Sequence, residues 1–339
     1  MKRLWLPLFV CLMFLVMQCG GEEQKPPEAE LCDACLNAAP DATSLEIRIP
    51  GDEESDINTM ALGELAFFYT QTRQMSDDTN FWILGTLGWL DEILTYPPTE
   101  HSGGYCIWGP FIPSGLSPVE QRFRMQQNSE TDYTYFWEER PKNTEDEWTM
   151  IWGGAIEPAT DTARRGIGQL NIDFTAAYAL DPALQQEGQI EVDYDTYTDG
   201  RRIDITFIDF MDLRPGQMTE PMDAAYHYHN RADNSGEFDF SFLADVHQEE
   251  WGETYPELET LTYATQWLPS GAGGCTCTVT GGDLSAPDYP GLTAPLEEIV
   301  ETECWNELFL RTYYVAVFKL EDGTEVTMDE EGDPTDCVL

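Results

Sequence analysis

The residues best suited to chemistry are two histidines, His227 and His229, in the run Tyr226-His227-Tyr228-His229. On a β-strand both imidazoles would project from one face, about 7 Å apart, a spacing that metal sites on sheets use. A divalent metal would need a third ligand, and a metal-dependent hydrolase would need an open site above it. The candidate third ligands are His101, His247, Asp223 and Glu237. In the simpler interpretation, which we favour, the tyrosines face the core and the histidines face water.

Acidic turns are a second set of candidate ligands, in this case for calcium. Asp193 and Asp195 precede Asp199-Gly200, and another acidic cluster spans residues 329–336. Neither cluster has the ligand spacing of an EF-hand loop, and an acidic chain produces such clusters by chance. A calcium-dependent surface interaction protein is therefore kept only as an alternative.

Cysteines outside the first twenty residues are candidates for disulfide bonds. Cys32 and Cys35 form a Cys-x-x-Cys motif, which fits a redox pair, half of a metal site or a local structural disulfide. We favour the structural disulfide, because an exported chain meets an oxidising compartment. Cys275 and Cys277 share one face of a predicted strand, so each is expected to pair elsewhere. The full set of disulfide candidates is Cys32, Cys35, Cys106, Cys275, Cys277, Cys304 and Cys337.

Sequence motifs of common enzymes are absent from the chain. It has no Gly-x-Ser-x-Gly elbow, no phosphate-binding Gly-x-x-x-x-Gly-Lys loop and no His-Glu-x-x-His helix. No cofactor is expected apart from the divalent metal considered above. We therefore expect a protein without catalytic activity.

The charge balance limits the partners. Acidic residues number 63 against 17 basic ones, which gives a net charge of −46. Such a surface repels nucleic acid and anionic lipid headgroups. It fits a well-solvated surface or, as the less favoured interpretation, a surface that holds cations or a basic partner.

Apolar and polar residues alternate through most of the second half of the chain, as in strands with one wet face. In residues 166–209, Leu170, Ile172 and Phe174 share a face, whereas Asp193 and Asp204 point the other way. Similar segments before and after predict a mainly β domain over residues 99–339. We expect an antiparallel meander that closes into a barrel or half-barrel, with a two-sheet β-sandwich as the alternative.

Helical periodicity occupies residues 56–98, ahead of the strands. The spacing predicts a pair of helices, Asn58 to Gln74 and Thr79 to Leu94, packed on the sheet. Asp77 and Asp78 are placed to cap the second helix, and Pro97-Pro98 ends it.

The N-terminus carries an export signal. Residues 1–18 place Lys2 and Arg3 before an apolar run too short to span a bilayer comfortably. The following Val16-Met17-Gln18-Cys19 resembles the lipobox of bacterial lipoproteins. That resemblance implies lipidation of Cys19, anchoring in a membrane and a place in the cell envelope, at the outer membrane. Residues 19–55 are expected to form the lipidated N-terminus and an acidic, proline-rich tether.

Together these features predict a non-catalytic lipoprotein of the cell envelope that acts as a binding or structural module. An apolar small ligand between sheet and helices, or a protein partner, would fit such a fold. The alternatives are the metal-dependent hydrolase that uses His227 and His229 and the calcium-dependent surface protein.

Overall fold

A computed structural model describes residues 29–51, 62–102, 105–113, 117–214, 221–246, 257–286 and 291–337. The fold is mainly β, as predicted. Its helices are α1 (Ala29–Ala38), α2 (Phe67–Ile93) and α3 (Phe174–Leu180), with short 3-10 helices η1 (Ala42–Ser44) and η2 (Pro334–Asp336). The strands are β1 (Glu100–Ser102), β2 (Tyr105–Phe111), β3 (Val119–Ser129), β4 (Asp132–Pro141), β5 (Thr149–Pro158), β6 (Gly166–Asp173), β7 (Gln186–Asp195), β8 (Arg201–Asp212), β9 (Met222–Asn230), β10 (Gly236–Ala244), β11 (Glu259–Trp267), β12 (Gly273–Thr280), β13 (Leu296–Trp305), β14 (Arg311–Leu320) and β15 (Glu325–Gly332).

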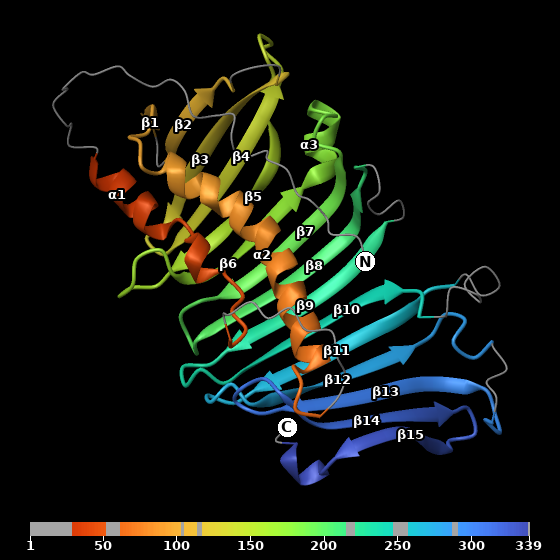
Figure 1. Ribbon diagram of the computed structural model, residues 1–339. Coiled ribbons are helices and arrows are strands. Elements are labelled where there is room, and N and C mark those ends of the chain that lie inside the picture. Colours follow the sequence, from red (N-terminus) through yellow and green to blue (C-terminus); the bar gives the residue numbers. More distant parts are fainter. Residues whose placement is uncertain are drawn as a thin grey trace.

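All 15 strands form one antiparallel sheet, in which each strand pairs with its neighbours in sequence. The order runs from β1 to β15 without a crossover, and β1 and β15 form the two edges (Figure 1). The sheet is therefore an open half-barrel and does not close into a barrel. Because one sheet contains every strand, the β-sandwich alternative is wrong.

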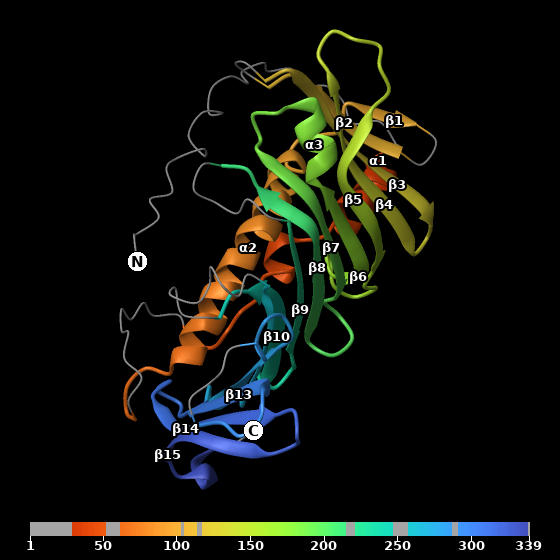
Figure 2. The same cartoon turned by 90° about the vertical axis from the view of Figure 1, so that its right-hand side faces the viewer.

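The two faces of the sheet have different surroundings. Helix α2 crosses the strands obliquely on one face, which we call the inner face (Figure 1). Seen from the side in Figure 2, the sheet bends around that helix. The opposite, outer face is not covered by any helix of the described part of the chain. Alternation along each strand thus sends apolar side chains inward and polar ones outward.

Three strands in the middle of the sheet show this alternation clearly. Leu170 of β6, Val192 of β7 and Ile205 of β8 are buried on the inner face, as predicted. Phe174 departs from the prediction, because β6 ends at Asp173 and Phe174 begins α3. The carboxylate of Asp173 accepts a hydrogen bond from the main-chain N–H of Ala176 (2.8 Å), which caps that helix.

Helix α2 is one continuous helix where a pair was predicted. It begins at Phe67 and runs through Asp77 and Asp78, which lie in its interior and do not cap a second helix. Ser76 and Thr79 donate to carbonyl oxygens of the preceding turn, Arg73 and Met75, so they fit inside the helix. No glycine or proline interrupts the junction. Residues 58–61 of the first predicted helix lie outside the described residues.

Part of the predicted tether belongs to the folded body. Leu45 and Ile47 are buried in the core, and α1 lies within the same region. Asn80 of α2 binds both main-chain groups of Ile47, accepting at 2.8 Å and donating at 2.7 Å. Residues 45–49 therefore pack against α2 as part of the folded body. The predicted signal, Cys19 and the first part of the tether lie outside the described residues.

Aromatic side chains attach α2 to the inner face. Phe68 meets Tyr263 of β11 edge to face with ring centroids 5.6 Å apart, and Trp82 meets Phe210 of β8 at 5.4 Å. Such pairs add stability beyond the area that they bury. In this part of the interface the aromatic residues fill the core.

The predicted disulfide candidates include both disulfide-bonded and free cysteines in the described residues. Cys304 and Cys337 form a disulfide, with their Cα atoms 5.3 Å apart, and Cys106 is also disulfide-bonded. Cys35, Cys275 and Cys277 are buried free thiols. The predicted disulfide between Cys32 and Cys35 is therefore wrong, and so is the expectation that Cys275 and Cys277 pair elsewhere. Burial of a thiol among apolar side chains does not require it to be oxidised.

None of the helices in the described residues is long and apolar enough to cross a membrane.

Candidate functional site

Both histidines lie on the outer face of β9, as the simpler interpretation predicted. Tyr226 and Tyr228 alternate with them and are buried on the inner face, 7% and 0% exposed. The alternation of strand side chains thus fixes both imidazoles on the same solvent-facing surface. Their neighbours come from β8 on one side and β10 on the other.

His227 is held between carboxylates of the two neighbouring strands. Its Nδ1 lies 2.5 Å from Oδ1 of Asp204, which is directly opposite on β8. Its Nε2 lies 3.6 Å from Oε1 of Glu237 on β10. The short contact with Asp204 orients the ring.

His229 shares the same carboxylate of Glu237. Its Nδ1 lies 3.6 Å from Glu237 Oε1, while its Nε2 donates to the main-chain carbonyl of Asp199 at 3.0 Å. Arg231 donates to the other oxygen of Glu237 at 2.9 Å. Glu237 therefore links both histidines and an arginine in one polar network.

Within the described residues, this network does not assemble a set of metal ligands. Glu237, one of the predicted third ligands, does approach both histidines, but no group of three His, Cys, Asp or Glu residues in the described parts of the chain could hold a metal ion. In each ring, the nitrogen that does not face Glu237 already has a partner. Nδ1 of His227 contacts Asp204, and Nε2 of His229 bonds to the main-chain carbonyl of Asp199. Asp223 instead accepts from the main-chain N–H of Asp209 at 2.9 Å, and His101 is on β1 at the edge of the sheet. His247 lies outside the described residues.

The pKa values of the two carboxyl groups of β10, those of Glu237 and Asp239, are shifted in opposite directions. Burial raises the pKa of Glu237, but the hydrogen bond and charge of Arg231, together with the two histidines, outweigh it, and the pKa is lowered. For Asp239, burial dominates and raises the pKa, because His227 offsets it only in part. Oδ1 of Asp239 is also buried without a hydrogen-bond partner.

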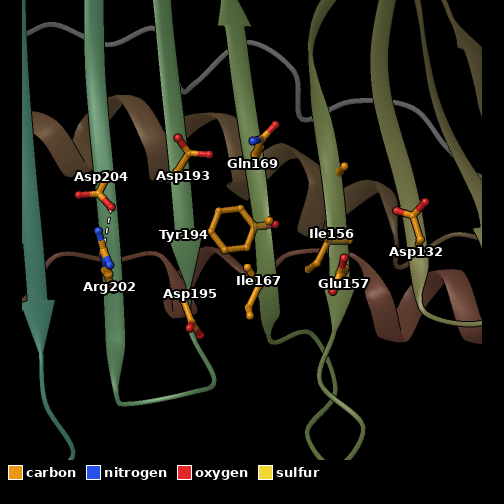
Figure 3. A pocket seen from close by; sticks show the side chains of 12 residues that line it. Asp132, Ile156, Glu157, Ile167, Gln169, Asp193, Tyr194, Asp195, Arg202 and Asp204 are labelled. Carbon is orange, nitrogen blue, oxygen red and sulfur yellow. Dashed lines mark hydrogen bonds and ion pairs between the residues drawn. The ribbon is translucent and has the colours of Figure 1, made fainter.

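Two shallow depressions mark the outer face beside this network. The larger, of about 440 Å³, extends from β4 to β8 and is shown in Figure 3 from the outer side. Its polar rim carries five carboxylates and a single arginine, Arg202, whose Nε lies 3.1 Å from Asp204 Oδ2. The five carboxylates belong to Asp132, Glu157, Asp193, Asp195 and Asp204.

The smaller depression, of about 320 Å³, continues from β8 to β11. Asp204 lines both depressions, and His227 and Asp239 line the second. The rest of its outer-face lining is uncharged: Thr206, Ala225, Ser241 and Thr262. The two depressions are neighbours that share Asp204, and we call the two together the outer groove.

A glycine of β6 makes room for a tyrosine ring on the inner face, behind the outer groove. Gly168 of β6 lies directly opposite Tyr194 of β7, whose ring covers it. A Cβ at position 168 would lie 2.5 Å from the Tyr194 hydroxyl oxygen and 2.4 Å from the main-chain oxygen of Ala155. Any larger residue would push Tyr194 away and change the strand spacing beneath the groove.

The acidic turns considered for calcium use their carboxylates to bind main-chain amides. Oδ1 of Asp195 accepts from the N–H groups of Tyr197 and Thr198, both at 2.9 Å. Asp333 accepts in the same way from Thr335 at 2.9 Å. These contacts of Asp195 and Asp333 shape the two turns.

Nor is the nearby hydroxyl group of Ser241 placed where His227 could activate it as a nucleophile. The side chain of Ser241 lies on one side of Asp239 along β10, and Glu237 lies on the other. Because Nε2 of His227 faces Glu237, it points away from Ser241. The pair of Asp204 and His227 therefore lacks the hydroxyl that hydrolases with a catalytic triad place at that nitrogen.

The fold and site define an open antiparallel half-barrel whose inner face is covered by a helix and whose outer face carries an acidic groove. Comparisons of the chain with protein-family models, curated proteins and solved structures found no match.

Proposed function

We propose that this protein is a non-catalytic, lipid-anchored module of the cell envelope that binds a partner through the outer face of its sheet. One observation carries the proposal. Helix α2 covers the inner face, whereas the outer face has no cover in the described residues and is hollowed by the outer groove. A large exposed sheet face with an asymmetric groove suits recognition of another molecule.

The packing on the inner face favours a protein partner bound at the outer face over an apolar small ligand bound between the sheet and α2. Rings of α2 and of the sheet meet each other there, as Trp82 does with Phe174 and Phe210. Side chains that pack in this way occupy the space that an apolar ligand would need. The geometry around His227, in which no nucleophile or metal set is assembled among described residues, supports a role in binding and not in catalysis.

The place in the cell envelope rests on the N-terminal sequence. The resemblance of Val16-Met17-Gln18-Cys19 to a lipobox supports lipidation of Cys19 and anchoring at the outer membrane. Cells that produce the chain can be labelled with a clickable fatty acid. The wild type should take up the label and Cys19→Ala should not. A wild type that stays unlabelled would remove the anchor from the proposal.

The outer face itself can be tested in the same cells with a photoreactive amino acid. Placed at Thr262 in the outer groove, it should form one defined adduct on irradiation. Placed at Ile112, an exposed residue outside the groove, it should not. Equal adducts at both positions, or none at Thr262, would contradict binding through this face.

A further inference from the structure

The outer groove contains a row of polar residues that crosses five strands. Strand register places Gln169, Asp193, Asp204, His227 and Asp239 opposite one another in that order, from β6 to β10. Neighbouring strands are about 4.8 Å apart, so the row places three carboxylates on a line across the strands, with Gln169 at one end and His227 between Asp204 and Asp239. Figure 3 shows Gln169, Asp193 and Asp204 side by side on this surface.

Part of the negative charge in this row lacks compensation. Asp193 lies directly opposite Asp204, and like charges in that arrangement repel each other. Asp204 has Arg202 and His227 as partners, whereas the exposed carboxylate of Asp193 has no hydrogen bond or ion pair within the described residues. Glu157, on the rim, is likewise exposed and without such a partner there. A cationic ligand would relieve the repulsion that the fold leaves in place.

The spacing favours several separate cations over one metal ion. A calcium ion draws its oxygen ligands to about 2.4 Å from a single centre. The carboxylates of the groove are instead distributed over β4, β5, β7, β8 and β10, and no three of the described acidic or histidine side chains could hold an ion. Such a distribution matches positive groups carried at intervals along a chain.

The uncharged surface between the carboxylates suits long aliphatic stems. Ile167 lines the larger depression and is 46% exposed, and Ala155 lies beside it. Ala225 and Thr206 give the smaller depression a similar uncharged surface of short side chains. Lysine and arginine cover apolar surface with their methylene groups while the charged end reaches a carboxylate.

We infer that the outer groove binds a lysine- or arginine-rich segment of a protein, laid across β5 to β10. This inference rests on the proposed use of the outer face. Each exposed ion pair contributes little by itself, so affinity depends on several pairs that form together along the segment. Binding weakens as salt is added, because the pairs remain near solvent.

The probe is a fluorescein-labelled peptide of ten lysines, titrated with the full chain at low ionic strength and followed by anisotropy. The site variant is Asp193→Asn with Glu157→Gln, which removes two exposed carboxylates that hold no other group in the described structure. The matched control is Glu325→Gln with Asp329→Asn on β15, which changes the net charge equally at the edge of the sheet. Unchanged thermal unfolding of both variants verifies that each is folded.

We expect the site variant to bind the peptide about tenfold more weakly and the control less than twofold, by analogy with the loss of two ion pairs. Equal weakening in both would show attraction to a generally acidic protein and would overturn the inference. Unchanged binding of the site variant would overturn it too. Spermine serves as a second probe: if it binds with the same variant dependence and the peptide does not bind, a small polyamine replaces the polypeptide. Failure of the peptide to bind would overturn the inference, and the photoreactive adduct at Thr262 then decides separately whether the proposed use of the outer face stands.

Discussion

The carboxylate of Glu303 on β13 caps the first turn of α2, where its Oε2 accepts a hydrogen bond from the main-chain N–H of Phe68 at 2.5 Å. Its Oε1 accepts from the N–H of Phe67 at 3.0 Å. Ala66, at the cap position itself, has no side chain that could do this. The sheet therefore supplies both the negative charge and the acceptors that the start of a helix needs.

Replacing Glu303 by alanine should lower the free energy of unfolding by about 3 kcal/mol, because two amides at the start of α2 lose their acceptor and buried Arg311 loses a nearby negative charge. Urea unfolding measures the loss. Glu298→Gln is the control, since its ion pair with Lys319 is near solvent and should contribute less than about 1 kcal/mol. Similar losses in both variants would show that Glu303 does not hold the helix.

Asp239 should make the protein less stable as pH rises. Its pKa is raised in the folded state, so the folded protein binds this proton more tightly than the unfolded chain does. The resulting stability is present below the ordinary value of 3.8 and is lost as pH rises through the folded pKa. Asp239→Asn should therefore gain stability relative to the wild type over that interval. Thermal unfolding across pH 3 to 7 measures the difference, and a constant difference would contradict the shift.

Glu237 should show the opposite dependence. Because its folded pKa is lowered, the stability that it contributes is present above the ordinary value of 4.5 and is lost as pH falls through the folded pKa. Glu237→Gln should cost about 1 kcal/mol near neutral pH, when Arg231 loses its partner. The deficit should shrink in acid. A deficit that grows in acid would mean that Arg231 and the histidines do not stabilise this carboxylate.

The buried thiols should be unreactive in the folded protein. Burial raises the pKa of Cys277 to about 12 and that of Cys35 to about 11, so almost no thiolate exists at pH 8. Maleimide labelling followed by peptide mapping should modify Cys277 and Cys35 slowly in native conditions and rapidly in urea. Fast labelling of the native protein would contradict the burial of both thiols.

Two glycines should respond in opposite ways to alanine. A Cβ at Gly154 would lie 1.8 Å from the main-chain oxygen of Gln169, so Gly154→Ala should cost about 2–3 kcal/mol through forced separation of β5 and β6. Nothing lies within 4 Å of a Cβ at Gly85 in α2. Gly85→Ala should instead add about 1 kcal/mol through helix propensity. Equal effects in urea unfolding would show that close strand contact at Gly154 is not limiting.

Alternation along the chain was sufficient to predict the antiparallel meander, because strands with one covered face must place apolar residues at every second position. Alternation did not indicate the strands in which apolar and polar side chains do not alternate. In β13, Glu297 and Glu298 are followed by Ile299 and Val300, and this grouping resembles a helical turn more than a strand. Strand β15 is acidic and almost wholly exposed, so pairing with β14 is what defines it.

In the N-terminal part of the chain, contacts between residues far apart in the sequence decide which side chains are buried. Residues 45–49 alternate apolar and charged side chains, but this pattern does not indicate that Ile47 is buried against Asn80 and the inner face. For the candidate site, alternation indicates that Asp193, Asp204 and His227 share the outer face. It does not indicate that they lie opposite one another. Register depends on turns and on bulges, such as the shift between Glu187 and Gln189, whose position the sequence does not specify.

The central claim, that the outer face is occupied in the envelope, is tested most directly by carbodiimide labelling of carboxylates in intact cells and in the purified chain. Asp193 and Glu157 should react readily in the purified protein and several-fold less in cells. Glu325 at the sheet edge should react alike in both, and the buried Glu303 in neither. Equal reactivity of Asp193 and Glu157 in cells and in the purified chain would show an unoccupied outer face and contradict this account.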